Sequence, residues 1–70
     1  MGIVRNIQNN DLYRYLGNNE YKNLRTGKTG VVDEETARKV FKINIEMTTI
    51  ANYHPIVEDL INKLNLKIQK

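Results

Sequence analysis

The chain has no cysteine, no tryptophan and no serine, and only one proline and one histidine among its 70 residues. The lack of cysteine excludes disulfides and the commonest zinc sites, and it favours a reducing compartment, so a cytoplasmic location is predicted. Without serine or cysteine, the single histidine, His54, has no nucleophile of the usual kind to activate. A lone histidine is also a poor basis for a zinc site. We therefore predict no enzymatic activity, no metal and no cofactor.

Long apolar runs are also missing from the sequence. No segment approaches the roughly 18 residues of a membrane span, and the first ten residues contain no continuous apolar stretch of the signal-peptide type. Neither membrane insertion nor export is therefore expected. A single domain covering residues 1–70 is predicted, and a chain of this size buries only about 60% of the surface exposed by its unfolded form. Formation of a homodimer is an expected source of added stability.

Positive charge is in excess, but only in the first half of the sequence. The net charge is +3; residues 1–32 carry five Lys and Arg against two Asp and Glu, whereas residues 33–70 carry six of each sign. Two interpretations of the excess remain open. It belongs either to the ordinary solvated surface of a slightly basic protein or to a surface that binds an anionic partner.

Two successive hairpins are predicted before residue 33. Residues 12–16 and 20–23 are rich in strand formers, and Gly17-Asn18-Asn19 between them is typical of a tight turn. Gly27 suits the left-handed position of the next turn, after which residues 28–32 return as a third strand. The apolar residues that precede these strands either pack beneath the sheet or add an edge strand: Ile3, Val4 and Ile7.

A first helix is predicted to begin at Asp33. An aspartate is a favourable N-cap, and Glu34 and Glu35 suit the positive first turn of a helix. Nothing before Pro55 forces the helix to stop, although Ile43-Asn44-Ile45 is a mediocre helix-forming stretch. Residues 33–54 are therefore expected to form either one helix or two.

A second helix is predicted from Pro55, since proline is disfavoured within a helix but accepted in its first turn. Its apolar residues recur at helical spacing and form a stripe that either faces the core or supports self-association. The fold class predicted is α+β, with a three-stranded antiparallel β-meander over about residues 1–32 followed by two α-helices over about residues 33–70. The residues predicted for self-association are Val57, Leu60, Ile61 and Leu64.

Gly27-Lys28-Thr29 is similar to the end of a phosphate-binding loop, but Lys22 stands where that loop requires its first glycine, so ordinary turn chemistry is predicted. The nine residues 21–29 locally resemble the second hairpin of WW domains, in which a Tyr, an Asn and a Thr surround the turn. The chain lacks both tryptophans of that family. The resemblance therefore implies the shape of the hairpin and not the proline-rich ligand.

Aromatic and basic residues alternate in the predicted sheet. Tyr13 and Tyr15 share one face of their strand, and Leu12, Arg14 and Leu16 share the other. If the leucines point inward, the tyrosines form an aromatic and basic patch with the cations of the next hairpin. Such a patch suits either a protein interface or exposed nucleic-acid bases. The predicted partner-binding residues are Tyr13, Tyr15, Tyr21, Lys22, Arg25 and Lys28.

In size and composition the chain resembles small phage or mobile-element proteins, which are compact, rich in Asn and Lys, and without a set of catalytic residues. That resemblance implies an inhibitor of host machinery, of the kind that includes anti-CRISPR proteins. The predicted function is binding of a partner protein or ribonucleoprotein through the sheet. The alternative is direct binding of single-stranded RNA or DNA by the same surface.

Overall fold

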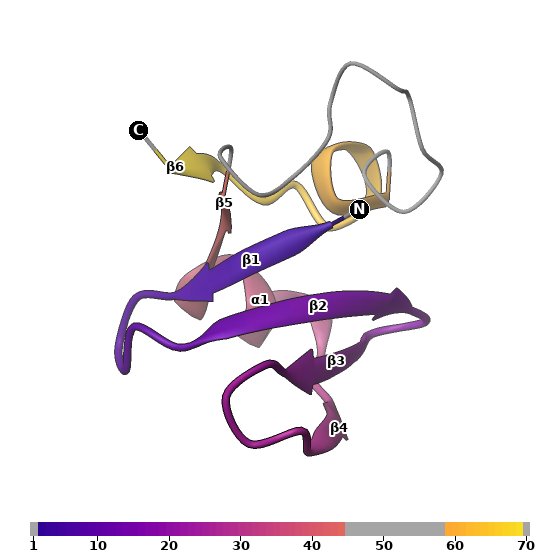
Figure 1. Cartoon of the computed structure of the whole chain (residues 1–70). Helices are drawn as coiled ribbons and strands as arrows, with labels where there is room; N and C mark the ends of the chain where they lie inside the picture. Colours follow the sequence, from indigo (N-terminus) through magenta and orange to yellow (C-terminus); the bar gives the residue numbers. More distant parts are fainter. Residues whose placement is uncertain (1, 45–58, 70) are drawn as a thin grey trace.

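The structure is a computed structural model that describes residues 2–44 and 59–69. Within these residues, six strands form one sheet in the order β4-β3-β2-β1-β5-β6, and only the last pair, β5 with β6, is parallel (Figure 1). None of the described helices is long and apolar enough to cross a membrane. The elements are β1 (Ile3–Asn6), β2 (Leu12–Gly17), β3 (Glu20–Asn23), β4 (Thr29–Val31), α1 (Glu34–Val40), β5 (Phe41–Asn44), a short π-helical turn η1 (Asp59–Lys63) and β6 (Ile68–Gln69).

The two predicted hairpins are confirmed, together with the chemistry of their turns. Asn18 and Asn19 connect β2 to β3 with φ values of 51° and 64°, the left-handed conformation that a two-residue hairpin turn requires. Gly27 has a φ of 78° in the turn between β3 and β4. In the same turn the Asn23 side chain accepts hydrogen bonds from the backbone N–H groups of Arg25 and Thr26. Local turn signals therefore determined the β2-β3-β4 meander.

The predicted fold class is nevertheless wrong, because the sheet extends beyond the meander. β1 is neither an edge strand nor packed beneath the sheet; it pairs with β2 on one side and with β5 on the other. Val4 lies opposite both Tyr13 and Ile43. β5 and β6 both come from the half of the chain predicted to be helical. Most of the described chain is thus a five-stranded antiparallel sheet with one short α-helix.

The first predicted helix begins as expected but ends early. The Asp33 side chain accepts a hydrogen bond from the Thr36 N–H at 2.9 Å, which caps α1. The backbone becomes extended at Phe41, and β5 starts there. Phe41 and Ile43 are buried on one face of β5, with the period-two spacing of a strand. The predicted continuation of this helix to residue 54 lies partly outside the described residues.

The second predicted helix is also corrected where the structure describes it. Within residues 59–69 only the turn η1 is helical, and the chain then leaves it through Asn65, whose φ is 56°, to form β6. A helix that ran on to Ile68 would leave the outer edge of β5 unpaired, whereas β6 pairs with it in parallel register. Pro55, where this helix was expected to begin, lies outside the described residues.

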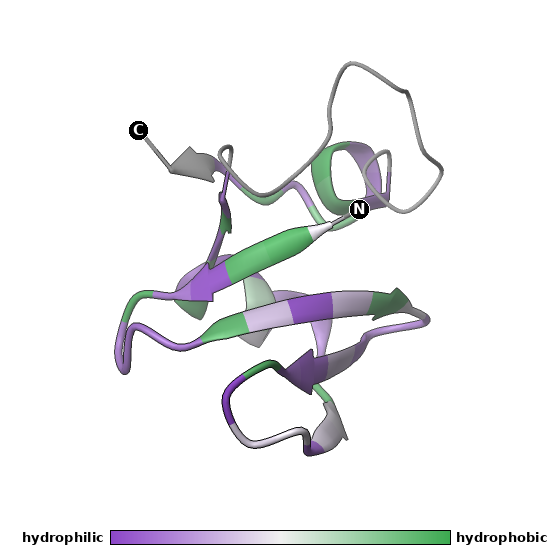
Figure 2. Ribbon diagram, in the orientation of Figure 1, coloured by the Kyte–Doolittle hydropathy of each residue, from purple (hydrophilic) through white to green (hydrophobic). Residues whose placement is uncertain are grey.

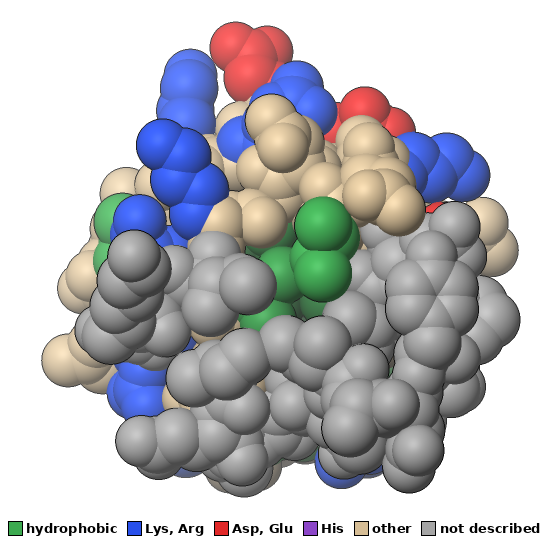
Figure 3. Space-filling view, turned by 90° about the horizontal axis from the view of Figure 1, so that it is seen from above, with side chains coloured by type: hydrophobic (Ala, Val, Ile, Leu, Met, Phe, Trp, Pro, Cys, Tyr) green, Lys and Arg blue, Asp and Glu red, His purple; other side chains and the backbone are tan. Residues whose placement is uncertain are grey.

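The core lies between one face of the sheet and the two helical segments. α1 lies behind the sheet in the view of Figure 1, and Figure 2 shows hydrophobic residues in the first part of β1 and at both ends of β2. Seen from above, hydrophobic side chains of the described residues reach the surface mainly in a small central patch (Figure 3). We call the core side of the sheet its inner face. The buried cluster comprises Val4, Tyr15, Tyr21, Ala37, Phe41, Ile43, Leu60, Leu64 and Leu66.

Candidate binding surface of the sheet

The tyrosines predicted to form an exposed patch lie on the inner face. Tyr15 and Tyr21 are 3% and 2% exposed, and their ring centroids are 5.0 Å apart. Tyr21 stacks on Phe41 at 4.6 Å, and Tyr13 is half-buried against the same ring at 5.1 Å. Burial of apolar aromatic area decides the orientation, because three rings bury more apolar surface than the leucines of the other face. Tyr15 and Tyr21 are therefore not available as exposed rings on the outer side of the sheet, as the predicted patch requires.

Tyr21 is unusual within this cluster. Among the described residues its hydroxyl is buried and has no hydrogen-bond partner. Burial raises the pKa of Tyr21 above the usual 10.0, and the nearby Tyr15 and Glu34 add to the shift. The neutral phenol is thus strongly favoured in the folded state.

Arg25, another predicted binding residue, has a partner within the chain. Its guanidinium donates two hydrogen bonds to the Asp11 carboxylate, each 3.0 Å long. Asn23 donates a third at 3.1 Å. The Arg25 and Asn23 hydrogen bonds hold the pKa of Asp11 below its usual 3.8. This ion pair anchors the start of β2 to the β3–β4 turn, so Arg25 is largely accounted for by the fold.

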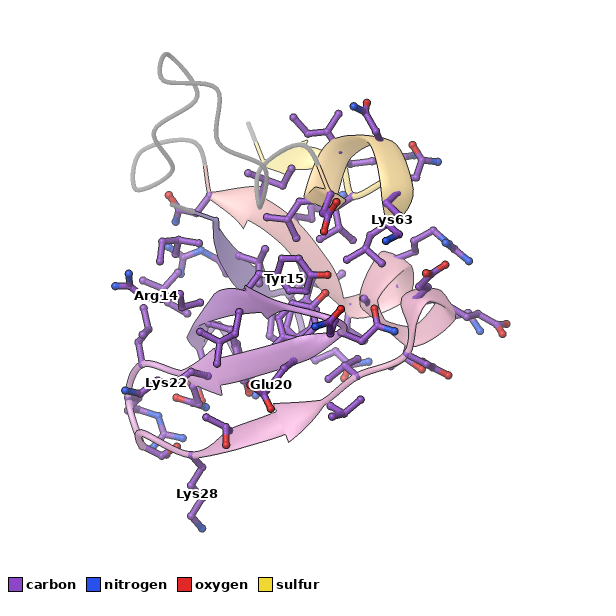
Figure 4. All side chains as sticks on the ribbon, turned by 90° about the vertical axis from the view of Figure 1, so that its right-hand side faces the viewer. Arg14, Tyr15, Glu20, Lys22, Lys28 and Lys63 are labelled. Carbon is purple, nitrogen blue, oxygen red and sulfur yellow. The ribbon has the colours of Figure 1, made fainter. Side chains whose placement is uncertain are left out.

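The outer face of the sheet carries cations that face each other across neighbouring strands. Arg14 lies directly opposite Lys22, and Arg5 lies directly opposite Lys42. Figure 4 shows Arg14 and Lys22 on the same side of the sheet, away from Tyr15. Lys22 is exposed and the other three are half-buried. We call these four residues the basic face.

Such pairing is unfavourable for the folded state. Directly opposite residues have Cβ atoms about 4.5–5.5 Å apart, where like charges destabilise a sheet. The structure gives Arg14, Lys22 and Lys42 no ion pair or hydrogen bond with any described side chain, whereas Arg5 donates to the Asn10 carbonyl at 3.3 Å. By contrast, α1 pairs its own charges, Glu34 with Arg38 and Glu35 with Lys39. An anion supplied from outside the described residues would relieve the repulsion.

A shallow groove of about 410 Å³ lies on the inner side of the sheet, next to β4. Tyr13 and Tyr21 contribute aromatic surface to it, and the Asp11–Arg25 pair lies at its border. Lys28, the last of the predicted binding residues, also lines this groove and extends away from the sheet in Figure 4. The lining residues are Asn9, Asp11, Tyr13, Tyr21, Asn23, Arg25, Thr26, Lys28, Thr29, Gly30 and Val32.

The three described residues among those predicted for self-association differ in burial. Leu60 and Leu64 are 0% and 1% exposed within the core of the same chain, so neither is free to contact a second copy. Ile61 is 36% exposed. Val57 lies outside the described residues.

Three residues of the basic face were not predicted as binding residues: Arg5, Arg14 and Lys42. A signal for Arg14 existed, because it alternates with Tyr13 and Tyr15 and must point outward once these point inward. No local signal existed for Arg5 and Lys42, because their proximity depends on the pairing of β1 with β5, 37 positions apart along the chain at that register.

Within residues 2–44 and 59–69, no three His, Cys, Asp or Glu side chains come together as a group that could hold a metal ion. Comparison with known proteins gave no match: no protein-family model fits the chain, and no curated protein or solved structure is significantly similar to it. The surface itself is therefore the basis for inferring a function.

Proposed function

We propose that this chain is a small, cytosolic, non-enzymatic binding protein whose basic face engages an acidic surface on a partner protein or ribonucleoprotein. The observation that carries the proposal is the like-charged cross-strand pair of Arg14 and Lys22, neither of which has an ion pair among the described residues. Arrangements that oppose local stability are expected at functional sites, where a partner supplies the compensation. The excess charge of the first half of the sequence belongs largely to this face.

A protein surface fits the basic face better than single-stranded nucleic acid. Single-strand binders combine cations with exposed aromatic rings on which bases stack. Here Tyr15 and Tyr21 are buried on the opposite face of the sheet, and Tyr13 packs against Phe41. The outer face instead offers cations beside the aliphatic Leu12, a combination that suits a mixed acidic and apolar protein surface.

The test compares anionic probes on two charge-matched variants. We expect the wild-type protein to bind a labelled glutamate-rich peptide more tightly at about 50 mM than at about 200 mM NaCl, and to bind labelled RNA and single-stranded DNA poorly. The double variant Arg14→Glu/Lys22→Glu should bind the peptide roughly tenfold more weakly. It keeps a like-charge pair, so its stability should change little.

The control variant Lys39→Glu/Lys63→Glu loses the same charge away from the basic face and should retain most of the binding. Equal losses in the two variants, or no binding of the peptide at either salt concentration, would contradict the proposal. Tighter binding of RNA or single-stranded DNA than of the peptide would favour direct nucleic-acid binding instead. Inhibition of a host defence system remains a prediction that neighbouring phage or defence genes would support.

A further inference from the structure

β4 is an edge strand whose outer backbone groups face away from the sheet. On the side that faces β3, the Asn23 N–H donates to the Lys28 carbonyl and the Val32 N–H donates to the Asn19 carbonyl, each at 2.8 Å. Gly30 lies between these positions, opposite Tyr21. Because alternate residues of an antiparallel strand point toward the partner, Thr29 and Val31 direct their N–H and C=O groups away from β3.

Apart from its short length, this edge lacks the features that usually prevent strand pairing. β4 contains no charged residue and no proline, and all three of its residues are exposed. Val31 is 75% exposed, which is high for a β-branched residue of a sheet. Among the described strands, only β3 pairs with β4, and Figure 1 shows β4 at the lower edge of the sheet. An extended chain could therefore add to this edge through four backbone groups.

The groove beside β4 determines which kind of chain fits. A Cβ atom added at Gly30 would meet no other atom within 4 Å, so the inner side of β4 is open at this position. In an added strand, the residue opposite Gly30 would point its side chain to the inner face, where a large side chain could extend over Gly30 toward Tyr21 in the groove. Lys28 lies two positions before Gly30, just before β4 begins, and has no ion pair among the described residues.

We propose that β4 accepts an extended segment of a partner protein by strand addition. The segment would place a large apolar side chain opposite Gly30, in the groove, and a carboxylate near Lys28. A second copy of the chain fits less well, because two β4 strands paired about Gly30 would place glycine opposite glycine and leave both grooves empty. Backbone hydrogen bonds would provide affinity and the groove would provide selectivity, as in other strand-addition sites.

The probe is a synthetic heptapeptide of alternating valine and threonine with a central phenylalanine and a terminal glutamate, titrated into the isotopically labelled protein. We expect saturable NMR shifts and slower hydrogen exchange at the Thr29 and Val31 amides. A peptide with glycine in the central position should bind roughly tenfold more weakly, since it leaves the groove empty. Absence of saturable binding at millimolar peptide would overturn the proposal.

Backbone variants separate strand addition from other modes of binding. Thr29→Pro and Val31→Pro each remove one outward N–H group while leaving the hydrogen bonds to β3, and both should abolish binding. Thr29→Ala and Val31→Ala keep these groups and should retain it. If a proline variant does not fold, a chemically synthesised chain N-methylated at Val31 replaces it. Binding that survives removal of the outward N–H would overturn the proposal.

Two further results complete the test. Concentration-dependent shifts of the β4 amides without peptide would show pairing with a second copy and overturn the proposed occupant. The Arg5→Glu/Lys42→Glu variant should bind the heptapeptide as the wild type does, because it changes the basic face on β1 and β5, which lie at least three strands away from β4. Failure of the acidic-partner proposal and failure of the strand-addition proposal are therefore distinguishable.

Discussion

At the scale of single residues, Tyr21 combines a ring that packs well in the apolar core with a hydroxyl that does not. Its ring is required in the core, where it stacks on Phe41 and contacts Tyr15. Its hydroxyl is carried into the same core without a partner among the described residues. Leaving a buried hydroxyl unpaired costs stability, whereas the ring alone provides the packing. The two contributions of this residue can therefore be separated by mutation.

Replacement of Tyr21 by Phe should stabilise the protein by roughly 1 kcal/mol, because it removes an unpaired buried hydroxyl and keeps the ring. The pKa of Tyr21 is raised in the folded state, so the wild type should lose stability as the pH rises above the unfolded-state value of about 10. The Phe variant lacks this loss. Urea unfolding from pH 7 to pH 11 measures both effects.

The matched control is Tyr15→Phe. The Tyr15 hydroxyl accepts a hydrogen bond from the Asn19 N–H at 3.4 Å, so its removal should not stabilise the protein. If Tyr21→Phe destabilised the protein as much as Tyr15→Phe, the Tyr21 hydroxyl would have to be satisfied in solution.

At the scale of elements, the C-terminal segment shows how packing assigns different roles to neighbouring apolar residues. The apolar stripe around η1 was compatible with a core-facing helix or with a dimer interface, and the spacing alone does not distinguish them. Packing against the sheet buries Leu60 and leaves its neighbour Ile61 partly exposed. Residues adjacent in sequence thus have very different roles.

Leu60→Ala should cost about 2–5 kcal/mol, which could unfold a domain of this size. Ile61→Ala should cost no more than about 1 kcal/mol, because the side chain is already in contact with water. Thermal unfolding of the two variants provides the comparison. Similar costs for both would mean that η1 does not pack on the sheet as described.

The boundary between α1 and β5 illustrates why element ends were hard to predict. Ala37, Val40 and Phe41 follow helical spacing, and Phe41 with Ile43 follows strand spacing, so the local pattern supports both. Pairing decides: the Ile7 N–H donates to the Val40 carbonyl at 2.8 Å, and Asn6 lies opposite Phe41. A contact between residues more than 30 positions apart therefore ended the helix.

At the scale of the whole molecule, charge is distributed unevenly between surfaces. α1 pairs its charges along its own length, and Arg25 is paired with Asp11. The basic face concentrates cations that repel one another across the sheet. This arrangement predicts that stability and partner binding make opposite demands on the same residues.

Lys22→Thr should stabilise the isolated protein by about 0.2–1 kcal/mol, since it removes the repulsion from Arg14 and places a good strand former in β3. Added NaCl should stabilise the wild type more than the variant, because salt screens a repulsion that only the wild type contains. Chemical unfolding at two salt concentrations measures this, with Lys28→Thr as the control. A destabilised Lys22→Thr variant would indicate that Lys22 has an attractive partner in solution.

The sequence by itself determined the local features: the hairpin turns at Asn18-Asn19 and Gly27, the Asp33 cap, and the confinement of excess charge to the first half. These depend on residues a few positions apart, whose preferences act in any context. Only the tertiary structure decided which face of β2 is buried, that β1 lies inside the sheet, and that Arg5 meets Lys42. The physical reason is that strand register and burial depend on contacts between distant segments, and local spacing carries no information about them.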